Sequence, residues 1–183
     1  MSVLGVCLSA DHSFSKSAVP AITLLPGLGV KGDAHAGTTD QHLPRKHINP
    51  PPPNLRQVHL MQSEILSAAS SDAAALKPGD VGENITTTGI DLLSLSKGTK
   101  LRFVDESSQN APDTTAVVTI TGLRNPCPRI DKFRAGLKEK FVVRNEERKI
   151  VQRKAGIMGV VEVGGEYSTG FTIDPIEALI PVL

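Results

Sequence analysis

Apolar residues in this chain occur in short stretches that polar residues, glycines and prolines separate. Stretches of four to eight residues that are rich in β-branched side chains and bounded by turn-forming residues are typical of β-strands. The pattern predicts strands over residues 2–9, 21–25, 57–61, 83–88, 99–104, 116–123, 150–152, 157–163 and 171–173. Turns between them are marked by pairs such as Pro26-Gly27 and Gly164-Gly165.

Helical periodicity is limited to two segments. Between residues 63 and 76 apolar side chains recur on one helical face, and Pro78 and Gly79 follow, so a helix is predicted there. A second, short helix is expected over residues 137–143. Many strands with glycine turns and only one or two peripheral helices predict a mainly β protein, a single β-barrel-like domain over residues 1–183.

Two segments interrupt the strand pattern. Residues 38–54 carry His42, His47 and four consecutive prolines, Pro50 to Pro53. A proline run favours extended polyproline conformation and excludes a helix, so this segment is expected to form a long surface loop or lid. Residues 105–115 are polar and are predicted to form a second loop.

Composition excludes several classes of protein. The chain has 183 residues, of which 39% are hydrophobic and 21% charged, and no apolar run approaches the roughly 20 residues of a membrane-spanning helix. These values indicate a soluble globular protein without a membrane partner. Aromatic residues make up only 3%, which argues against a nucleic-acid partner, because single-stranded nucleic acids stack on aromatic side chains.

The charge is balanced overall but unevenly distributed. Twenty Lys and Arg against nineteen Asp and Glu give +1, yet residues 124–154 contain eleven basic and four acidic residues. A local positive field of this kind suits an anionic ligand. The alternative is a solvated basic helix face.

Cysteine usage indicates the cellular compartment. Cys7 and Cys127 match no Cys-x-x-Cys pattern, and the N-terminal residues show no basic n-region and only a short apolar stretch. We therefore expect free thiols and a cytoplasmic location. Cys7 lies among apolar residues of a predicted strand and is expected to be a small core residue.

Cys127 is the strongest candidate for chemistry. Pro126 and Pro128 restrict the backbone on either side of it, so the thiol is held on a stiff loop. Arg124 and Arg129 are close in sequence, and cations beside a thiol favour the thiolate, which is the nucleophile and the metal ligand. The alternative is a loop cysteine that packs as a small hydrophobic residue.

The histidines allow a weaker metal-site hypothesis. A zinc protein or hydrolase would use His35 and His59, but neither a Cys-x-x-Cys pair nor a His-Glu-x-x-His helix is present. His35 lies between glycines that would let a ligand approach, or it is a turn histidine bonded to Asp33. His59 has the pattern of a buried strand residue.

Five ordered sequence blocks together resemble the molybdenum cofactor sulfurase C-terminal (MOSC) domain family in its small stand-alone form. The blocks are residues 29–37 (GVKGDAHAG), 54–60 (NLRQVHL), 79–89 (GDVGENITTTG), 121–131 (TGLRNPCPRID) and 153–161 (RKAGIMGVV). The resemblance implies a closed β-barrel of the pyruvate-kinase barrel-like kind.

The resemblance also implies a function centred on Cys127. In this family the matching cysteine is proposed to ligate molybdenum of a bound molybdopterin cofactor, or to carry sulfur received from a pyridoxal-phosphate-dependent cysteine desulfurase. Pyridoxal phosphate would be bound only by that partner. Some members reduce N-hydroxylated compounds with an electron-transfer partner. The expected cofactor-binding residues are Lys31, His35, Arg56, Glu83, Asn84, Thr86, Thr87, Arg124, Asn125 and Arg129.

Overall fold

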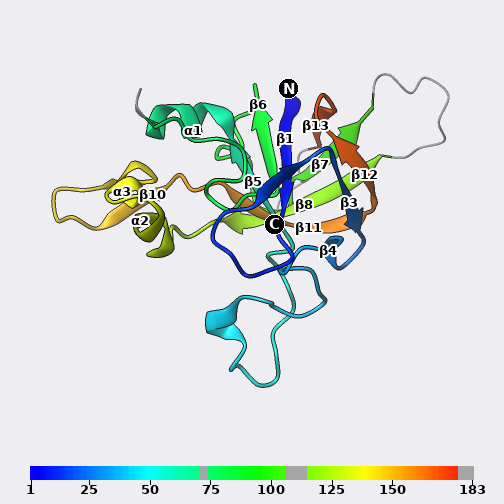
Figure 1. Ribbon diagram of the computed structural model, residues 1–183, viewed down its shortest axis with the longest axis horizontal. Coiled ribbons are helices and arrows are strands. Elements are labelled where there is room, and N and C mark those ends of the chain that lie inside the picture. The colour runs from blue at the N-terminus through cyan, green and yellow to red at the C-terminus, as the bar shows by residue number, and fades with distance from the viewer. Residues whose placement is uncertain (71–73, 106–114, 177–183) are drawn as a thin grey trace, which may run out of the picture.

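The structure is a computed structural model of the chain, and it describes residues 1–70, 74–105 and 115–176. Eight strands form its largest sheet (Figure 1): β1 (Ser2–Leu8), β2 (Ser17–Val19), β5 (Val58–Gln62), β6 (Ile85–Thr88), β7 (Lys100–Val104), β8 (Ala116–Leu123), β11 (Ile157–Val163) and β13 (Thr172–Ile176). Their spatial order is β13-β7-β8-β11-β5-β6-β1-β2, and β13 also pairs with β1. All of these strands except β2 therefore close into a barrel, which confirms the predicted fold class.

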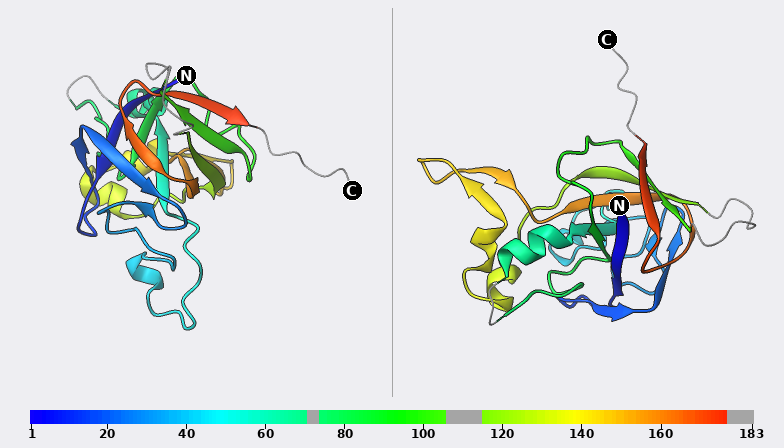
Figure 2. Two further views of the ribbon diagram at one scale, coloured as in Figure 1. Left: turned by 90° about the vertical axis from the view of Figure 1, so that its right-hand side faces the viewer. Right: turned by 90° about the horizontal axis from the view of Figure 1, so that it is seen from above.

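Smaller elements surround the barrel. Strands β3 (Ala21–Leu25), β4 (Gly29–Val30) and β12 (Gly165–Ser168) form a three-stranded sheet, and β9 (Val142–Arg144) pairs with β10 (Ile150–Arg153). The described residues contain three α-helices, α1 (Ser63–Ala69), α2 (Arg129–Phe133) and α3 (Leu137–Lys140), and a 3-10 helix η1 (Leu43–Arg45). Figure 2 shows β9, β10, α2 and α3 together on one side of the barrel.

Two apolar clusters fill the interior. Residues alternate between buried and more exposed along β7 and β8, so Leu101, Phe103, Val118 and Ile120 point into the barrel. A second cluster lies outside the barrel wall, where Met61 of β5 packs with residues of α1, α2 and α3. Strand β5 is therefore buried along its whole length, because its two faces belong to different clusters.

The strand predictions are confirmed to within a few residues, whereas both helices are shorter than predicted. The first ends at Ala69, because Ser70 adopts an extended backbone with ψ 165°. The Ser70 hydroxyl donates to the Leu66 carbonyl at 2.7 Å and accepts from the Leu76 amide at 2.8 Å. Residues 71–73 of this predicted helix lie outside the described residues.

The second predicted helix is wrong in its last residues. Helix α3 ends at Lys140, and Val142 begins β9, which pairs with β10. Helix α2 and the short strands β2, β4, β9 and β12 were not predicted, because segments of two to five residues carry too little periodicity.

The proline-rich segment is a surface loop, as predicted, and contains η1. Thr39 forms a β-bridge with Pro53, and the backbone N–H of Asn54 donates to the Thr38 carbonyl at 2.9 Å, so the two ends of the loop are held together. The second predicted loop lies mostly outside the described residues, at 106–114. No helix in the described part of the chain has the length and apolar character needed to cross a bilayer.

Candidate functional site

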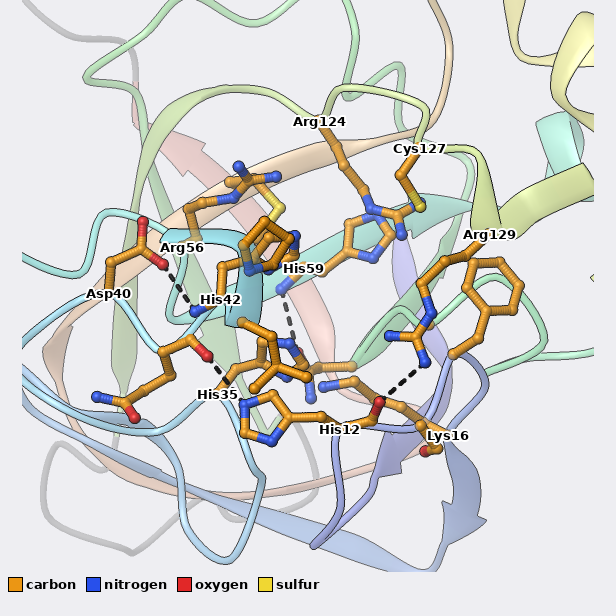
Figure 3. Close-up of a pocket in the computed structure, with 18 of the residues that line it drawn as sticks. His12, Lys16, His35, Asp40, His42, Arg56, His59, Arg124, Cys127 and Arg129 are labelled. Atoms are coloured by element: carbon orange, nitrogen blue, oxygen red, sulfur yellow. Dashed lines mark hydrogen bonds between the residues drawn. The ribbon is translucent and has the colours of Figure 1, made fainter. Parts of the chain in front are cut away.

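A cavity of about 390 Å³ lies beside β5, between the loop at residues 38–54 and the loop that carries Cys127. Segments far apart in the sequence form its wall (Figure 3): His12 and Lys16 precede β2, Arg56 precedes β5, and Cys127 follows β8. The cavity therefore depends on the closed barrel rather than on any one sequence block.

Cys127 lines this cavity and is half-buried. Its loop is fixed at both ends, since the Arg124 amide donates to the Gly156 carbonyl at 2.9 Å and the Ile130 amide donates to the Cys127 carbonyl at 3.2 Å. The thiol also packs against the second apolar cluster. The sequence left open whether Cys127 is a reactive thiol or a loop cysteine that packs as a small hydrophobic residue. Both descriptions apply, because one side of the residue packs against apolar side chains and the other lines the cavity.

Four basic side chains line the same cavity: Lys16, Arg56, Arg124 and Arg129. The Cys127 sulfur and the Arg124 guanidinium lie next to each other in Figure 3. Burial lowers the pKa of Arg124, while negative charge at Cys127 and Glu83 opposes this shift. Burial also lowers the pKa of Arg56, and Asp40 and Cys127 oppose it. The nitrogen Nη1 of Arg124 is buried without a hydrogen-bond partner in the described residues.

Asp33 holds three of the cavity residues in place. Its carboxylate pairs with the Lys16 ammonium and accepts hydrogen bonds from the His35 amide at 2.9 Å and the Asn84 side-chain amide at 3.0 Å. Burial alone would raise the pKa of Asp33, but the hydrogen bonds and the Lys16 charge outweigh it and lower the pKa. Burial lowers the pKa of Lys16, and Asp33 opposes that shift.

Histidine rings form one side of the cavity. The ring centroids of His12 and His35 are 5.1 Å apart, and those of His35 and His42 are 5.7 Å apart. Burial, with Arg56 and His35, lowers the pKa of His42 to about 4, so this ring is neutral near pH 7. The predicted turn contact of His35 is present, since its Nδ1 lies 3.2 Å from an Asp33 oxygen.

His59 is a buried neutral histidine at the base of the cavity. Its Nε2 donates to the Ala155 carbonyl at 2.8 Å, which leaves Nδ1 as an unprotonated acceptor. Burial, with the Arg124 charge, lowers its pKa well below the ordinary value. Its Nδ1 has no hydrogen-bond partner among the described residues.

The structure brings six of the predicted site residues to the cavity: His35, Arg56, Asn84, Arg124, Cys127 and Arg129. Three others are buried away from its lining: Glu83, Thr86 and Thr87. The Glu83 carboxylate accepts hydrogen bonds from the Gly79 amide at 2.8 Å and the Thr86 hydroxyl at 3.0 Å. Burial raises the pKa of Glu83. These side chains are oriented toward the protein interior.

The other two predicted residues are exposed. Lys31 does not line the cavity, and Asn125 lines a smaller hollow that shares Arg56 and Met158 with it. Sequence reasoning missed His12, Lys16 and Asp40 as cavity residues, because no motif marks them and only the folded chain brings them to Cys127. His42 was named only as a residue of the predicted loop at residues 38–54. Within the described residues, no three His, Cys, Asp or Glu side chains are arranged to hold a metal ion.

The MOSC domain family model matches residues 35–173, which is most of the chain. The protein belongs to the MOSC domain family. This family is associated with molybdenum-cofactor binding and sulfur transfer. The matched region contains the cavity residues from His35 to Met158, including Cys127.

Solved structures share the fold at low sequence identity. The YuaD protein from Bacillus subtilis is 20% identical with a TM-score of 0.74, and the match covers 97% of this chain and 96% of that one. YiiM from Escherichia coli is 16% identical with a TM-score of 0.59, over 98% of this chain and 71% of that one. YiiM from Geobacillus stearothermophilus is 14% identical with a TM-score of 0.56, over 100% and 76%. No curated protein sequence matches this chain significantly.

Proposed function

We propose that this MOSC protein binds the molybdenum cofactor, with Cys127 as the molybdenum ligand, and acts in oxygen-atom or sulfur transfer. The observation that carries the proposal is a thiol and a buried guanidinium with a free nitrogen in one cavity of about 390 Å³. A soft metal such as molybdenum favours thiolate ligands. Anionic groups favour the nitrogen donors of arginine.

The charge of the cavity fits an anionic cofactor. Molybdopterin ends in a phosphate, and Arg56, Arg124 and Arg129 would bind such a group. Asp40 is the one carboxylate among the lining residues, and it pairs with Arg45 at 3.2 Å. The cavity therefore keeps a surplus of positive charge for a ligand.

The uncharged side chains fit the rest of the cofactor and a substrate. The rings of His12, His35 and His42 offer faces and polar edges to a planar heterocycle. His59 offers an unprotonated Nδ1, which would accept a hydrogen bond. The cofactor itself supplies a redox-active metal held by dithiolene sulfurs.

The proposed reaction class includes the reduction of N-hydroxylated compounds with a partner reductase. Conversion of a hydroxylamine to an amine consumes two electrons and two protons and releases one water molecule. Both electrons would come from the partner, because the two cysteines of this chain are fewer than the four thiolates that typically hold an iron–sulfur cluster.

A second candidate is a sulfur carrier that holds a Cys127 persulfide received from a pyridoxal-phosphate-dependent cysteine desulfurase. The half-buried position of Cys127 favours this role too, since the sulfur is reachable from the cavity. A carrier needs only thiolate character and access.

Metal analysis tests the first candidate. Protein purified from a host that makes the cofactor should contain molybdenum in near-stoichiometric amount, and Cys127→Ser should lose most of it. Cys7→Ala is the matched control, because it removes the other thiol, and it should keep its molybdenum. Equal metal content in Cys127→Ser and the wild type would show that Cys127 is not the ligand.

Mass spectrometry tests the second candidate. After incubation with a cysteine desulfurase and cysteine, the peptide containing Cys127 should gain the mass of one sulfur atom that dithiothreitol removes. Absence of the adduct, under conditions that load a known acceptor, would rule the carrier role out.

A further inference from the structure

Residues 129–154 form a unit that leaves the barrel at the cavity and returns to it there. The unit contains α2, α3, β9 and β10 and begins directly after Cys127 and Pro128. It ends at Lys154, and the next residue, Ala155, accepts the hydrogen bond from His59 at 2.8 Å. Both ends of this unit therefore adjoin residues of the cavity wall.

The inner side of the unit is apolar and fixed. Ile130, Leu137 and Phe141 are buried in the second apolar cluster, where they pack with Met61 and Leu66. The Lys154 amide also donates to the Phe141 carbonyl at 2.8 Å. The unit is thus held against the barrel wall, and its outer side has a defined position relative to Cys127.

The outer side is strongly basic. The unit contains ten basic and four acidic residues. Two of the acidic residues already pair with cations of the unit, Glu139 with Arg144 and Glu147 with Lys149. Exposed cations that form no ion pair within the described part of the chain are Arg129, Lys132, Lys140, Arg148 and Arg153.

Exposed apolar side chains lie among these charges. Phe133, Ile150 and Val151 are 40%, 38% and 61% exposed. All four residues of β10 are exposed, and β10 pairs only with β9 in the described sheets. Protein–protein interfaces combine exposed apolar side chains with polar and charged ones, and this unit presents both. A surface that binds only phosphates has no need of exposed Ile and Val, so a protein partner is favoured over a nucleic acid or a membrane.

We propose that the outer face of residues 129–154 docks a small acidic electron-carrier protein of the flavodoxin class at the mouth of the Cys127 cavity. The partner's acidic surface would complement the unpaired cations and set its orientation. The choice of an electron carrier rests on the proposed reductive function, in which each turnover oxidises two reduced carriers by one electron each.

Binding to a purified acidic flavodoxin tests this proposal. Isothermal titration calorimetry at low salt should show binding by the wild type that weakens as salt is added. The double variant Arg148→Glu/Arg153→Glu should bind about tenfold more weakly or worse. The matched control Lys77→Glu/Lys97→Glu makes the same change of charge at exposed lysines outside the unit and should bind like the wild type.

Further measurements distinguish docking of a protein from binding of RNA or a membrane, and test docking independently of the cofactor proposal. An RNA duplex and vesicles of phosphatidylcholine with phosphatidylglycerol should bind more weakly than flavodoxin. No flavodoxin binding, equal binding by the unit and control variants, or tighter binding of RNA or vesicles would overturn the docking proposal. Arg148→Glu/Arg153→Glu should keep its molybdenum, and Cys127→Ser should keep its affinity for flavodoxin. Failure of the docking proposal can therefore be distinguished from failure of the cofactor proposal.

Discussion

The two cysteines of this chain lie in regions that differ in access to water and in the charge of their neighbours. Cys7 is fully buried in β1, and burial, followed by the charge of Glu83, raises its pKa to about 12. Cys127 is half-buried in a cavity with four basic side chains. The comparison teaches that surroundings, not residue type, decide whether a thiol can react, because only a solvent-accessible thiolate is a nucleophile or a metal ligand.

The largest expected difference between the two regions is in thiol reactivity. At pH 8 a pKa of about 12 leaves Cys7 with roughly a thousandfold less thiolate than an ordinary thiol. Cys7 is also closed off from solvent, so iodoacetamide should modify Cys127 in the folded protein at least roughly a hundredfold faster than Cys7, as measured by mass spectrometry of quenched digests. In guanidinium chloride the two rates should converge. Comparable rates in the folded protein would contradict the comparison.

Lys16 connects the two regions, because it lines the cavity and its charge also acts on Cys7. Its ammonium is the buried partner of Asp33. Lys16→Met leaves the buried Asp33 carboxylate without its paired cation and should lower the free energy of unfolding at pH 7 by about 3 kcal/mol. Urea denaturation measures this change, and Lys97→Met, at an exposed position, should stay within about 0.5 kcal/mol of the wild type.

The pH dependence of the same variant sharpens the test. The folded pKa of Asp33 lies below its unfolded value, so its stabilising contribution is present above the unfolded pKa and is lost as the pH falls through the folded pKa. The stability gap between Lys16→Met and the wild type should therefore narrow below about pH 4, near the ordinary pKa of Asp. A gap that stays constant from pH 7 to pH 3 would show that packing, not charge, causes the loss.

The same two regions show how far the sequence could be interpreted. Alternating apolar residues predicted the barrel strands, since one face of each strand must be buried. Cys127 was predicted as a site residue because its two prolines and nearby arginines are local in sequence. Lys16 and His12 could not be predicted, because they reach Cys127 only through closure of the barrel and carry no motif.

Resemblance between sequence blocks was less informative about side-chain direction. The block at residues 79–89 was expected to contact the cofactor, yet Glu83, Thr86 and Thr87 bond to the protein interior and do not line the cavity. The cause is the position of β6 between β1 and β5, where three of its four residues are buried. A sequence block shows which segment is near a site, but the neighbouring strands decide which of its side chains reach the site.

The smallest expected effect isolates the contribution of one charge to the cavity. Arg124→Met removes the guanidinium beside Cys127. Because a nearby cation stabilises a thiolate, its loss should slow the modification of Cys127 by iodoacetamide about fivefold. Added salt should reproduce only part of this change, because the guanidinium is buried and weakly screened. Lys132→Met, which removes an exposed cation of α2, is the matched control and should change the rate less than about twofold. If Lys132→Met slowed the reaction as much as Arg124→Met, the reactivity of Cys127 would reflect the general positive field of residues 124–154. A larger effect of Arg124→Met would instead assign it to the buried guanidinium beside the sulfur.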